Sequence, residues 1–494
     1  MSTWLLGVDI GTSSCKAAVF DPEGRVKAAG SSAYAVRYPE KGWAEQDPED
    51  WWRGACLAIR EAVEAGGIRP EEIAGIGVDG QSWAAVALDR GGNVLCPTPI
   101  WTDTRSAEIC REAAARDTEG ALFALCGNPA QPGYTWPKIL WYREKRPEVF
   151  RRTEKILQSN SYIVYRLTGE ITQDLSQGYG LACFDMRKGC WDGEACAFLG
   201  IPRSLLPEIY SCHQVVGALT RQAAEATGLR EGTPVVAGGL DAACGTLGAG
   251  VVSPGQTQEQ GGQAGGMSIC IDRYAADPRL ILGFHAVPGR WLLQGGTTGG
   301  GGALKWLRAA VCPELSFAEM SALAEQAPAG SGGVAFLPYL AGERSPVWNP
   351  RACGVFFGLN FSVERKELIR ACMEGVAYAL RHNLETAEAA GARAETLRAM
   401  GGSANSRIWT QIKADVTGRR IETPGSDTAT TLGAAILAGA GTGVYGSFEE
   451  AAARTVRVRE TYEPDPEKRG IYDRGYETYL KLYPALEEIM NAQE

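Results

Sequence analysis

The sequence predicts a protein of the α/β class built from two large domains. Its 494 residues exceed what one hydrophobic core usually supports, so two domains are expected. Short apolar runs with the pattern of strands alternate along the chain with amphipathic patterns of helical period. The 62 glycines exceed the average share of about 7% and cluster between the apolar runs, which favours tight strand connections and close approach of the backbone to a ligand.

The charge and composition exclude several classes of partner and site. A formal net charge of −9 disfavours nucleic acid and anionic membranes, because both carry negative charge themselves. The N-terminus lacks the basic region of a signal peptide, and no apolar run approaches the roughly 18 residues that a membrane-spanning helix needs. The 14 cysteines form no CxxC pair and the three histidines lie far apart, so we expect no zinc site, reduced thiols and a cytoplasmic protein.

The first ordered stretch, residues 5–20, predicts a hairpin that holds phosphate. An apolar run stops at Asp9, turns through small and hydroxyl residues, and resumes as a second apolar run. Lys16 can supply positive charge, and Asp9 can position a hydrated magnesium ion. The candidate phosphate donors in the turn are the backbone and hydroxyl groups of Gly11, Thr12, Ser13 and Ser14. The alternative is an ordinary hairpin whose aspartate bonds only its own turn.

The elements that follow come in the order sheet, helix, sheet. Asp47 and Pro48 predict the start of a helix, because they supply an N-cap and a proline at the first helical position. Expected after the hairpin are a turn at 21–24, a strand at 25–35, this helix ending at 66–67, and strands at 73–78 and 83–89.

Residues 75–80 match the dinucleotide pattern G-x-G-x-x-G, so a nicotinamide-dependent dehydrogenase is an alternative to weigh. That pattern must open a helix, whereas residues 82–89 have the character of a strand. The match is therefore interpreted as accidental. No G-x-x-x-x-G-K-[ST] motif occurs, which removes the P-loop route to ATP.

Later strand ends also carry polar groups. An apolar strand at 233–240 delivers Asp241 past two glycines, and the small residues 242–249 suit a closely packed helix. As an isolated residue, Asp241 is expected to be only a helix N-cap. A second half begins near Gly255, and residues 260–266 resemble a second hairpin, which indicates that the two halves share a plan.

Two glycine-rich loops in the second half suit a nucleotide. Residues 294–302 lead into a helix at 303–307, where a nucleotide could meet helix N–H groups. Residues 400–406 leave room for a flat ring against the backbone. The amphipathic helix at 367–388 and the tyrosines between 472 and 483 are interpreted as packing.

Together these stretches resemble the FGGY family of sugar kinases, with xylulokinases as the nearest branch. Residues 354–359, Gly-Val-Phe-Phe-Gly-Leu, followed after seven residues by 367–374, fit the C-terminal signature of that family throughout. Its N-terminal signature is matched by Lys138, Ile139 and Trp141, while Tyr142 and Lys145 depart from it. Further similar segments are 284–291, 342–346 and 399–402, and the resemblance spans 5–446.

The resemblance implies two domains of the actin-like and hexokinase-like, or ribonuclease H-like, ATPase fold, with ATP and sugar meeting in the interdomain cleft. The implied N-terminal FGGY domain, on the sugar and phosphate side, is 1–248. The nucleotide-side C-terminal FGGY domain is 249–446, followed by a helical tail at 447–494.

The resemblance also implies the roles of individual residues. Asp241 is the expected general base, and Asp9 and Asp241 are the expected magnesium ligands. Expected around the phosphates are Gly11, Thr12, Ser13, Ser14 and Lys16; around the nucleotide Gly262, Gly301, Gly302, Gly401, Gly402 and Asn405; and around the sugar Gln81, Ser82, Trp83, Trp101, Asp103 and Asp241. The chemistry is coherent, because a sugar hydroxyl needs a carboxylate to accept its proton while magnesium and N–H donors stabilise the phosphate charge.

Three segments depart from the xylulokinase pattern. Residues 80–84 are Gly-Gln-Ser-Trp-Ala where Gly-Gln-Met-His-Gly is usual, and Ala242 replaces an asparagine, so both departures concern the sugar. Residues 262–265 are Gly-Gln-Ala-Gly in place of Gly-Thr-Ser-Gly, which removes two hydroxyl donors near the phosphates and concerns the rate.

The expected function is ATP-dependent phosphorylation of a small ketose, with D-xylulose as the first substrate to test. The alternatives are another ketose or polyol, such as ribulose, glycerol or L-xylulose. A different class, motivated by the altered second hairpin, is a sugar-responsive ATP-binding protein without turnover. The expected cofactors are ATP and Mg²⁺ and the expected partner is a small sugar, while the oligomeric state, including a homodimer, stays open.

Overall fold

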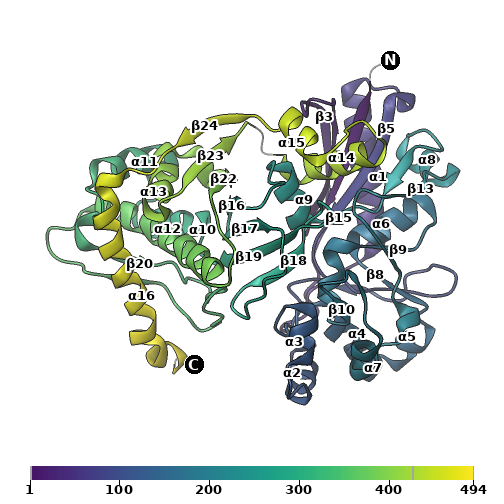
Figure 1. Ribbon diagram of the computed structural model, residues 1–494, viewed down its shortest axis with the longest axis horizontal. Helices are drawn as coiled ribbons and strands as arrows, with labels where there is room; N and C mark the ends of the chain where they lie inside the picture. The colour runs from purple at the N-terminus through teal and green to yellow at the C-terminus, as the bar shows by residue number, and fades with distance from the viewer. Residues whose placement is uncertain (1–2, 426–427, 493–494) are drawn as a thin grey trace.

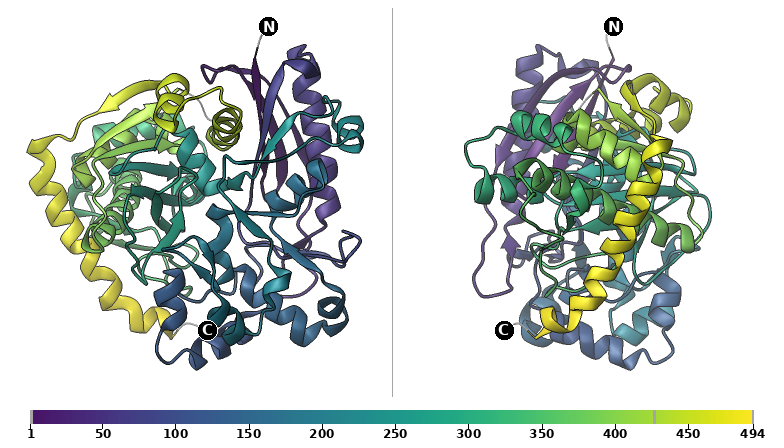
Figure 2. Two further views of the ribbon diagram at one scale, coloured as in Figure 1. Left: turned by 45° about the vertical axis from the view of Figure 1, so that its right-hand side comes forward. Right: turned by 90° about the vertical axis from the view of Figure 1, so that its left-hand side faces the viewer.

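The computed structural model describes residues 3–425 and 428–492, which form two seven-stranded sheets with helices packed around them. Figure 1 shows the N-terminal half, in purple and blue, beside the C-terminal half, in green and yellow. The left view of Figure 2 also shows the two halves side by side, and in its right view the C-terminal half lies in front of the N-terminal half. No helix in the described ranges is long and apolar enough to cross a membrane.

The first sheet is built around the predicted hairpin, which the structure confirms. Its order is β13-β14-β5-β1-β2-β3, with β15 also pairing with β5. Its strands are β1 (Trp4–Ile10), β2 (Ser14–Phe20), β3 (Val26–Ala33), β5 (Ile73–Gly80), β13 (Val215–Ala218), β14 (Pro234–Val236) and β15 (Gly239–Leu240). Residues 75–80 lie inside β5, so the dinucleotide pattern opens no helix.

The second sheet has the order β18-β19-β17-β16-β22-β23-β24. Its strands are β16 (Gln256–Gly261), β17 (Gly265–Ile271), β18 (Ile281–Phe284), β19 (Trp291–Thr297), β22 (Thr396–Met400), β23 (Arg420–Pro424) and β24 (Val458–Tyr462). In both sheets an antiparallel hairpin lies between a third antiparallel strand and two parallel neighbours. The shared plan that the two hairpins indicate is therefore confirmed.

Short strand pairs and helices complete each half. The pairs are β4 (Glu45–Gln46) with β7 (Thr98–Pro99), β6 (Val86–Leu88) with β8 (Lys155–Leu157), β9 (Thr172–Asp174) with β12 (Glu208–Tyr210), β10 (Phe184–Asp185) with β11 (Cys190–Trp191), and β20 (Ala335–Leu337) with β21 (Val355–Phe357). The strand expected at 83–89 is thus shorter, because Trp83 has φ 54° and interrupts extended backbone.

The α-helices of the first half are α1 (Pro48–Gly66), α2 (Ala107–Arg116), α3 (Ala121–Cys126), α4 (Thr135–Lys145), α5 (Pro147–Arg152), α6 (Ser159–Thr168), α7 (Gly193–Leu199), α8 (Arg221–Thr227) and α9 (Asp241–Gly248). The helix predicted from Asp47 and Pro48 is α1, and the Asp47 side chain accepts a hydrogen bond from the Glu49 N–H at its start. It packs across β2 and β3 and covers one face of the first sheet.

The second half contains α10 (Gly301–Val311), α11 (Phe317–Gln326), α12 (Arg365–Ala389), α13 (Arg407–Thr417), α14 (Ala429–Gly441), α15 (Phe448–Thr455) and α16 (Arg469–Asn491). The long helix α12 matches the predicted amphipathic scaffold. The expected helical tail, 447–494, is not helical throughout, because β24 pairs with β23 and forms an edge of the second sheet.

Two helices join the halves at their middle. Helix α14 packs on α9 and against β1 and β5 of the first sheet. Glycine is required for this contact, because a Cβ on Gly7 would lie 1.9 Å from the Thr431 carbonyl oxygen and one on Gly77 would lie 1.9 Å from that of Ala434. The strand ends that follow these glycines, with Asp9 and Asp79, are therefore held next to the second half.

Candidate active site

A cavity of about 400 Å³ lies between the two halves, and both contribute to its wall. The first half contributes Thr12, Ser82, Trp83, Trp101, Tyr179 and Asp241, and the second contributes Gln258, Gln260, Gly262, Gln263, Gln294 and Arg344, among others. Five of the residues predicted for sugar, phosphate or base chemistry therefore lie on one wall, although they are far apart in sequence.

Asp241 is the first residue of α9, directly after β15. The cap position is occupied by Leu240, so Asp241 is not the helix N-cap that it would be expected to be as an isolated residue. Its Oδ1 accepts a hydrogen bond of 2.6 Å from the Ala242 N–H. Burial, reinforced by the charge of Asp9, raises the pKa of Asp241 to about 7, the range that suits a general base at neutral pH.

Asp9 lies near the end of β1 and pairs in register with Lys16 across the hairpin. Its carboxylate is only 6% exposed, and its Oδ2 accepts a hydrogen bond of 3.1 Å from the Thr430 hydroxyl of α14. Asp9 therefore interacts across the junction of the halves rather than only with its own turn. Burial raises the pKa of Asp9, and the charge of Lys16 and the Thr430 hydroxyl oppose this shift.

Hydrogen bonds to its backbone carbonyl groups hold the turn between β1 and β2 in place. The Tyr34 hydroxyl donates to the Gly11 oxygen at 2.6 Å, the Gln46 Nε2 to the Thr12 oxygen at 2.8 Å, and the Tyr34 N–H to the Ser13 oxygen at 3.1 Å. Thr12 and Ser14 are half-buried and Ser13 and Lys16 are exposed, so the polar groups predicted to meet phosphate stay accessible. This arrangement is typical of an anion-binding turn.

Part of the cavity wall that the first half contributes is aromatic. The Trp83 backbone lies in the left-handed region, and its backbone N–H donates to the side-chain oxygens of Gln158 and Gln177, each at 3.1 Å. Its ring makes edge contacts with Tyr134 and Tyr179, at centroid distances of 4.6 and 5.7 Å. A strained backbone held by two buried amides is typical of a residue whose placement matters for function.

Comparison with known proteins identifies the family. Residues 4–248 match the N-terminal domain of the FGGY family of carbohydrate kinases, and residues 276–442 match the C-terminal domain of the same family. The chain belongs to the FGGY family of carbohydrate kinases. It is an enzyme that phosphorylates a carbohydrate with ATP, and its fold is the actin-like ATPase fold.

Individual FGGY kinases match this chain over nearly its whole length. The chain is 34% identical to a xylulose kinase of Escherichia coli over 489 residues, which cover 98% of this chain and 99% of that protein. A solved xylulose kinase from Rhodospirillum rubrum matches with a TM-score of 0.91 at 32% identity, over 99% of this chain and 100% of that one. A solved gluconate kinase from Lactobacillus acidophilus matches with a TM-score of 0.92 at 25% identity, over 98% of each chain.

Two residues predicted to contact the sugar, Gln81 and Asp103, are buried and do not line the cavity of this FGGY kinase, so their contact with sugar stays a prediction. The Gln81 side chain donates to the Gln46 side chain at 2.8 Å. The Asp103 carboxylate is fully buried, accepts from the Ala44 N–H at 2.6 Å, and pairs with Arg105 at 2.8 Å. Gln46 and Ala44 come from another segment of the chain, so no local sequence pattern indicates that these side chains are already engaged.

Asp79 is a polar residue of this site that the sequence prediction missed. It pairs in register with Asp9 on the neighbouring parallel strand and is fully buried. Burial raises the pKa of Asp79 well above its usual range, and the charges of Asp9 and Asp241 raise it further. An acid at the end of an otherwise apolar strand is the signal that could have identified it, but it lay inside the dinucleotide pattern.

The second hairpin meets the start of α10 directly. The Gly301 N–H donates to the Gly262 oxygen at 2.7 Å, and the Gly302 N–H donates to the Gln263 oxygen at 2.9 Å. These two N–H groups already have backbone partners, and the contact of the two glycines with a nucleotide stays a prediction. A Cβ on Gly301 would lie 2.7 Å from the Gly262 oxygen, so the close approach needs glycine.

The other predicted nucleotide residues lie after β22. Gly401 has φ +81° and would place a Cβ 3.1 Å from the Gly261 backbone, while a Cβ on Gly402 would meet open space. Asn405 follows and lines a groove of about 910 Å³ between α11 and α13. The loop therefore connects the second hairpin to an open groove.

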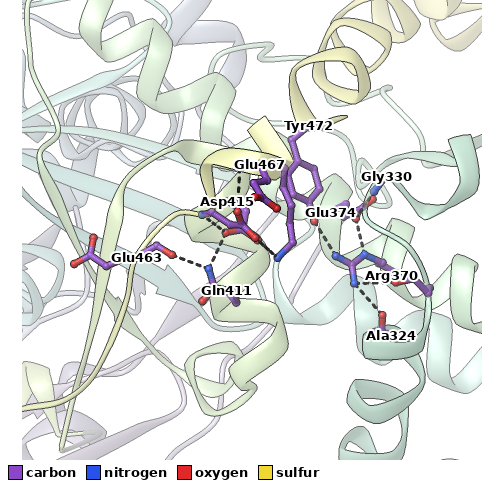
Figure 3. A network of polar contacts seen from close by, with 12 residues as sticks. Ala324, Gly330, Arg370, Glu374, Gln411, Asp415, Glu463, Glu467 and Tyr472 are labelled. Atoms are coloured by element: carbon purple, nitrogen blue, oxygen red, sulfur yellow. Dashed lines mark hydrogen bonds and ion pairs between the residues drawn. The ribbon is translucent and has the colours of Figure 1, made fainter. Parts of the chain in front are cut away.

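Ion pairs and hydrogen bonds hold charged side chains that line this groove (Figure 3). Arg370 pairs with Glu374 at 2.8 Å and donates to the Tyr472 hydroxyl at 2.8 Å. Lys468 pairs with Asp415 at 3.3 Å. These bonds connect α12 and α13 with α16 and the residues before it, so Arg370, Asp415 and Lys468, which line the groove, already have protein partners.

The residues present fit a magnesium ion that arrives with nucleotide. In residues 3–425 and 428–492, no group of three or more His, Cys, Asp or Glu side chains is arranged to hold a metal ion. The candidate carboxylates are Asp9 and Asp241, which lie close enough for the charge of Asp9 to raise the pKa of Asp241. Magnesium commonly takes one or two carboxylates and completes its shell with water and substrate phosphates.

Proposed function

We propose that this FGGY kinase transfers the γ-phosphoryl group of ATP to a hydroxyl of D-xylulose or a closely related ketose, with Asp241 as general base. The observation that carries the proposal is the position of Asp241, whose pKa is about 7, in a cavity that also contains the turn residue Thr12 and the aromatic wall. Xylulose is the first substrate because the chain is similar over nearly its full length to proteins named xylulose kinase.

The proposed reaction needs one proton transfer and one phosphoryl transfer. Unprotonated Asp241 accepts the proton of the sugar hydroxyl, whose oxygen forms a bond to the γ-phosphorus as the bond to the β-γ bridging oxygen breaks. ADP leaves with that bridging oxygen, and the proton remains on Asp241 until solvent removes it. Magnesium, when bound with ATP at Asp9 and Asp241, would offset the charge of the phosphates.

The two halves are proposed to divide the substrates. The first half holds the phosphates at residues 11–14 and Lys16 and the sugar at Ser82, Trp83 and Trp101. The second half receives the adenosine at Gly401, Gly402 and the groove lined by Asn405. Because both halves form the cavity wall, the transferred group would be enclosed and shielded from water, which favours sugar over hydrolysis.

A sugar acid is a second candidate substrate. The Arg344 side chain lines the cavity, where its charge acts on Tyr134 and Tyr179, and it makes no hydrogen bond or ion pair within residues 3–425 and 428–492. An unpaired guanidinium suits a carboxylate, which it can bind through two parallel hydrogen bonds. The fold similarity to a gluconate kinase supports including aldonic acids beside ribulose, L-xylulose and glycerol.

The proposed compartment is the cytoplasm. Each of the 14 cysteines is a free thiol, and most are buried. Such thiols are typical of proteins in a reducing environment, where ATP is also at hand.

A substrate panel tests the proposed function. Purified full-length protein with Mg·ATP would be assayed for ADP release with pentuloses, hexuloses, polyols and aldonic acids, with Asp241→Asn as the matched control. We expect D-xylulose to stimulate ADP release and D241N to abolish the stimulation. The proposal is wrong if no compound stimulates ADP release or if D241N retains the wild-type rate.

A further inference from the structure

Trp101 connects the sugar wall directly to the phosphate turn. Its indole Nε1 donates a hydrogen bond of 3.0 Å to the Thr12 hydroxyl oxygen. Both residues lie on the wall of the cavity that contains Asp241, and Trp101 is 40% exposed. A side chain expected only to contact sugar is therefore bonded to a side chain expected to contact phosphate.

The Thr12 backbone is already fixed by other groups, so this bond acts on the hydroxyl alone. The backbone carbonyl oxygen of Thr12 accepts a hydrogen bond from Gln46 Nε2 at 2.8 Å. The Gln46 side-chain oxygen in turn accepts from Gln81 Nε2 at 2.8 Å and from Trp51 Nε1 at 3.0 Å. With the main chain held in this way, rotation of the threonine side chain is the freedom that remains.

The direction of the Trp101 bond fixes where the threonine proton can go. An indole N–H can only donate, so the hydroxyl oxygen of Thr12 must be the acceptor. The hydroxyl proton is then free to point at a different acceptor. In the cleft, the acceptors that a phosphate turn meets are phosphoryl oxygens, which accept strong hydrogen bonds.

The loop that carries Trp101 is itself held by buried charges. Asp103, two residues on, accepts from the Ala44 N–H and pairs with Arg105. On the other side, Lys138 donates to the Gly133 oxygen at 2.6 Å and to the Trp83 oxygen at 2.8 Å. A Cβ on Gly133 would lie 2.6 Å from the Trp101 carbonyl oxygen, so the Lys138 side chain supports the backbone beside both aromatic residues of the wall.

We propose that Trp101 is a positioning residue that couples the sugar wall to phosphoryl transfer by orienting the Thr12 hydroxyl. Sugar packed on the ring would fix the indole, and the indole would hold Thr12 with its proton toward the transferred phosphoryl group. The inference rests on the proposed function, because it assigns the two ends of the cavity to sugar and phosphate.

A double-mutant cycle tests the coupling. Trp101→Phe keeps an aromatic wall and removes the N–H, while Thr12→Val removes the hydroxyl and keeps the shape. We expect each to lower kcat about tenfold with the sugar KM changed less than about threefold, and the double variant to be no slower than T12V. Thr12→Ser is expected to restore most of kcat, and Trp191→Phe, whose indole bonds Pro207 outside the cavity, to match the wild type.

Additive losses in the double variant, or a W101F variant with wild-type kcat, would overturn the coupling. If W101F does not fold, Trp101→Tyr serves as the second variant in the same cycle.

A measurement without turnover separates this inference from the proposed function. In protein labelled with ¹⁵N-tryptophan, the indole resonance that disappears in W101F, or in W101Y, is that of Trp101. We expect this resonance to shift in T12V but not in T12S, and to shift when Mg²⁺ and a non-hydrolysable ATP analogue are added to the wild type. A resonance unmoved by T12V would contradict the bond whatever the substrate proves to be, whereas absence of sugar phosphorylation with an intact shift would contradict only the proposed function.

Discussion

The two hairpins at the centre of the two sheets have the same plan and different chemistry. In the first, Asp9 pairs with Lys16 one step before the last pair of the hairpin. At the same step of the second hairpin, Gln260 pairs with Gly266. The first hairpin therefore carries a carboxylate and an ammonium group next to the turn that is proposed to bind phosphate, whereas the second carries no charge at that step.

The carbonyl groups of the two turns are also used differently. Those of the first turn accept from Tyr34 and Gln46, which lie in the same half and leave the turn open toward the cavity. Those of the second accept from the first N–H groups of α10. Two hairpins with one backbone plan thus differ in what they contact: the second holds a helix, and the first is open to the cavity where the proposed chemistry takes place.

The largest effect is expected at the base. Asp241→Asn removes the proton acceptor but keeps the shape, so kcat is expected to fall about a thousandfold while ATP binding, measured by calorimetry, persists. Asp192→Asn, at the half-buried N-cap of α7, is the matched control and is expected to retain full activity. A D241N variant with more than a tenth of the wild-type kcat would show that the chemistry lies elsewhere.

The next effect compares equivalent positions of the two hairpins. Asp9→Asn is expected to lower kcat/KM for Mg·ATP about a hundredfold, because it removes a carboxylate from the phosphate end of the cavity. Gln260→Ala, at the corresponding step, is expected to stay within about threefold of the wild type, since it removes no charge. Equal losses in steady-state kinetics would mean that the second hairpin shares the chemistry.

A pH profile tests the first half more finely. Because the pKa of Asp241 is raised to about 7 and only the unprotonated carboxylate can accept a proton, kcat/KM is expected to fall tenfold for each unit below that pKa. The charge of Asp9 contributes to the shift, so the D9N variant is expected to move the limb to lower pH. A flat profile between pH 5 and 8 would argue against Asp241 as the base.

The smallest effect is expected from restoring the second turn. The double substitution Gln263→Thr with Ala264→Ser supplies two hydroxyl donors near the phosphates, and one good hydrogen bond would raise kcat about fivefold. The matched control is Gln263→Ala, which removes the amide without adding a hydroxyl. No gain in kcat would indicate that this turn serves mainly to pack α10.

Much of the fold could be predicted because its signals are local. The hairpin at 5–20 and helix α1 follow from neighbouring residues, and the structure confirms both. The placement of Gln81 and Asp103 could not be predicted, because Gln46 and Ala44 reach them from another segment. The roles of the glycines expected to contact the nucleotide stay predictions. The hydrogen bonds between α10 and the second turn could not be predicted, because they join segments that meet only in the folded chain.

The site was predictable where one strand end delivers one polar group, and not where neighbouring strands combine. Asp9 and Asp241 each follow an apolar run and were predicted. Asp79 becomes important only because it pairs in register with Asp9. Thr430 likewise reaches Asp9 from a helix that lies more than four hundred residues later in the chain. Contacts between residues so far apart in the sequence leave no local sequence pattern.

One measurement tests the central claim directly, that the charged first half transfers phosphate to sugar. Phosphorus NMR of full-length protein with Mg·ATP and D-xylulose follows the fate of the γ-phosphoryl group. A phosphomonoester resonance that grows in step with ADP, and that is absent with D241N, is the predicted result. Binding of ATP that tightens with sugar while no phosphomonoester forms from any compound of the panel would contradict the claim.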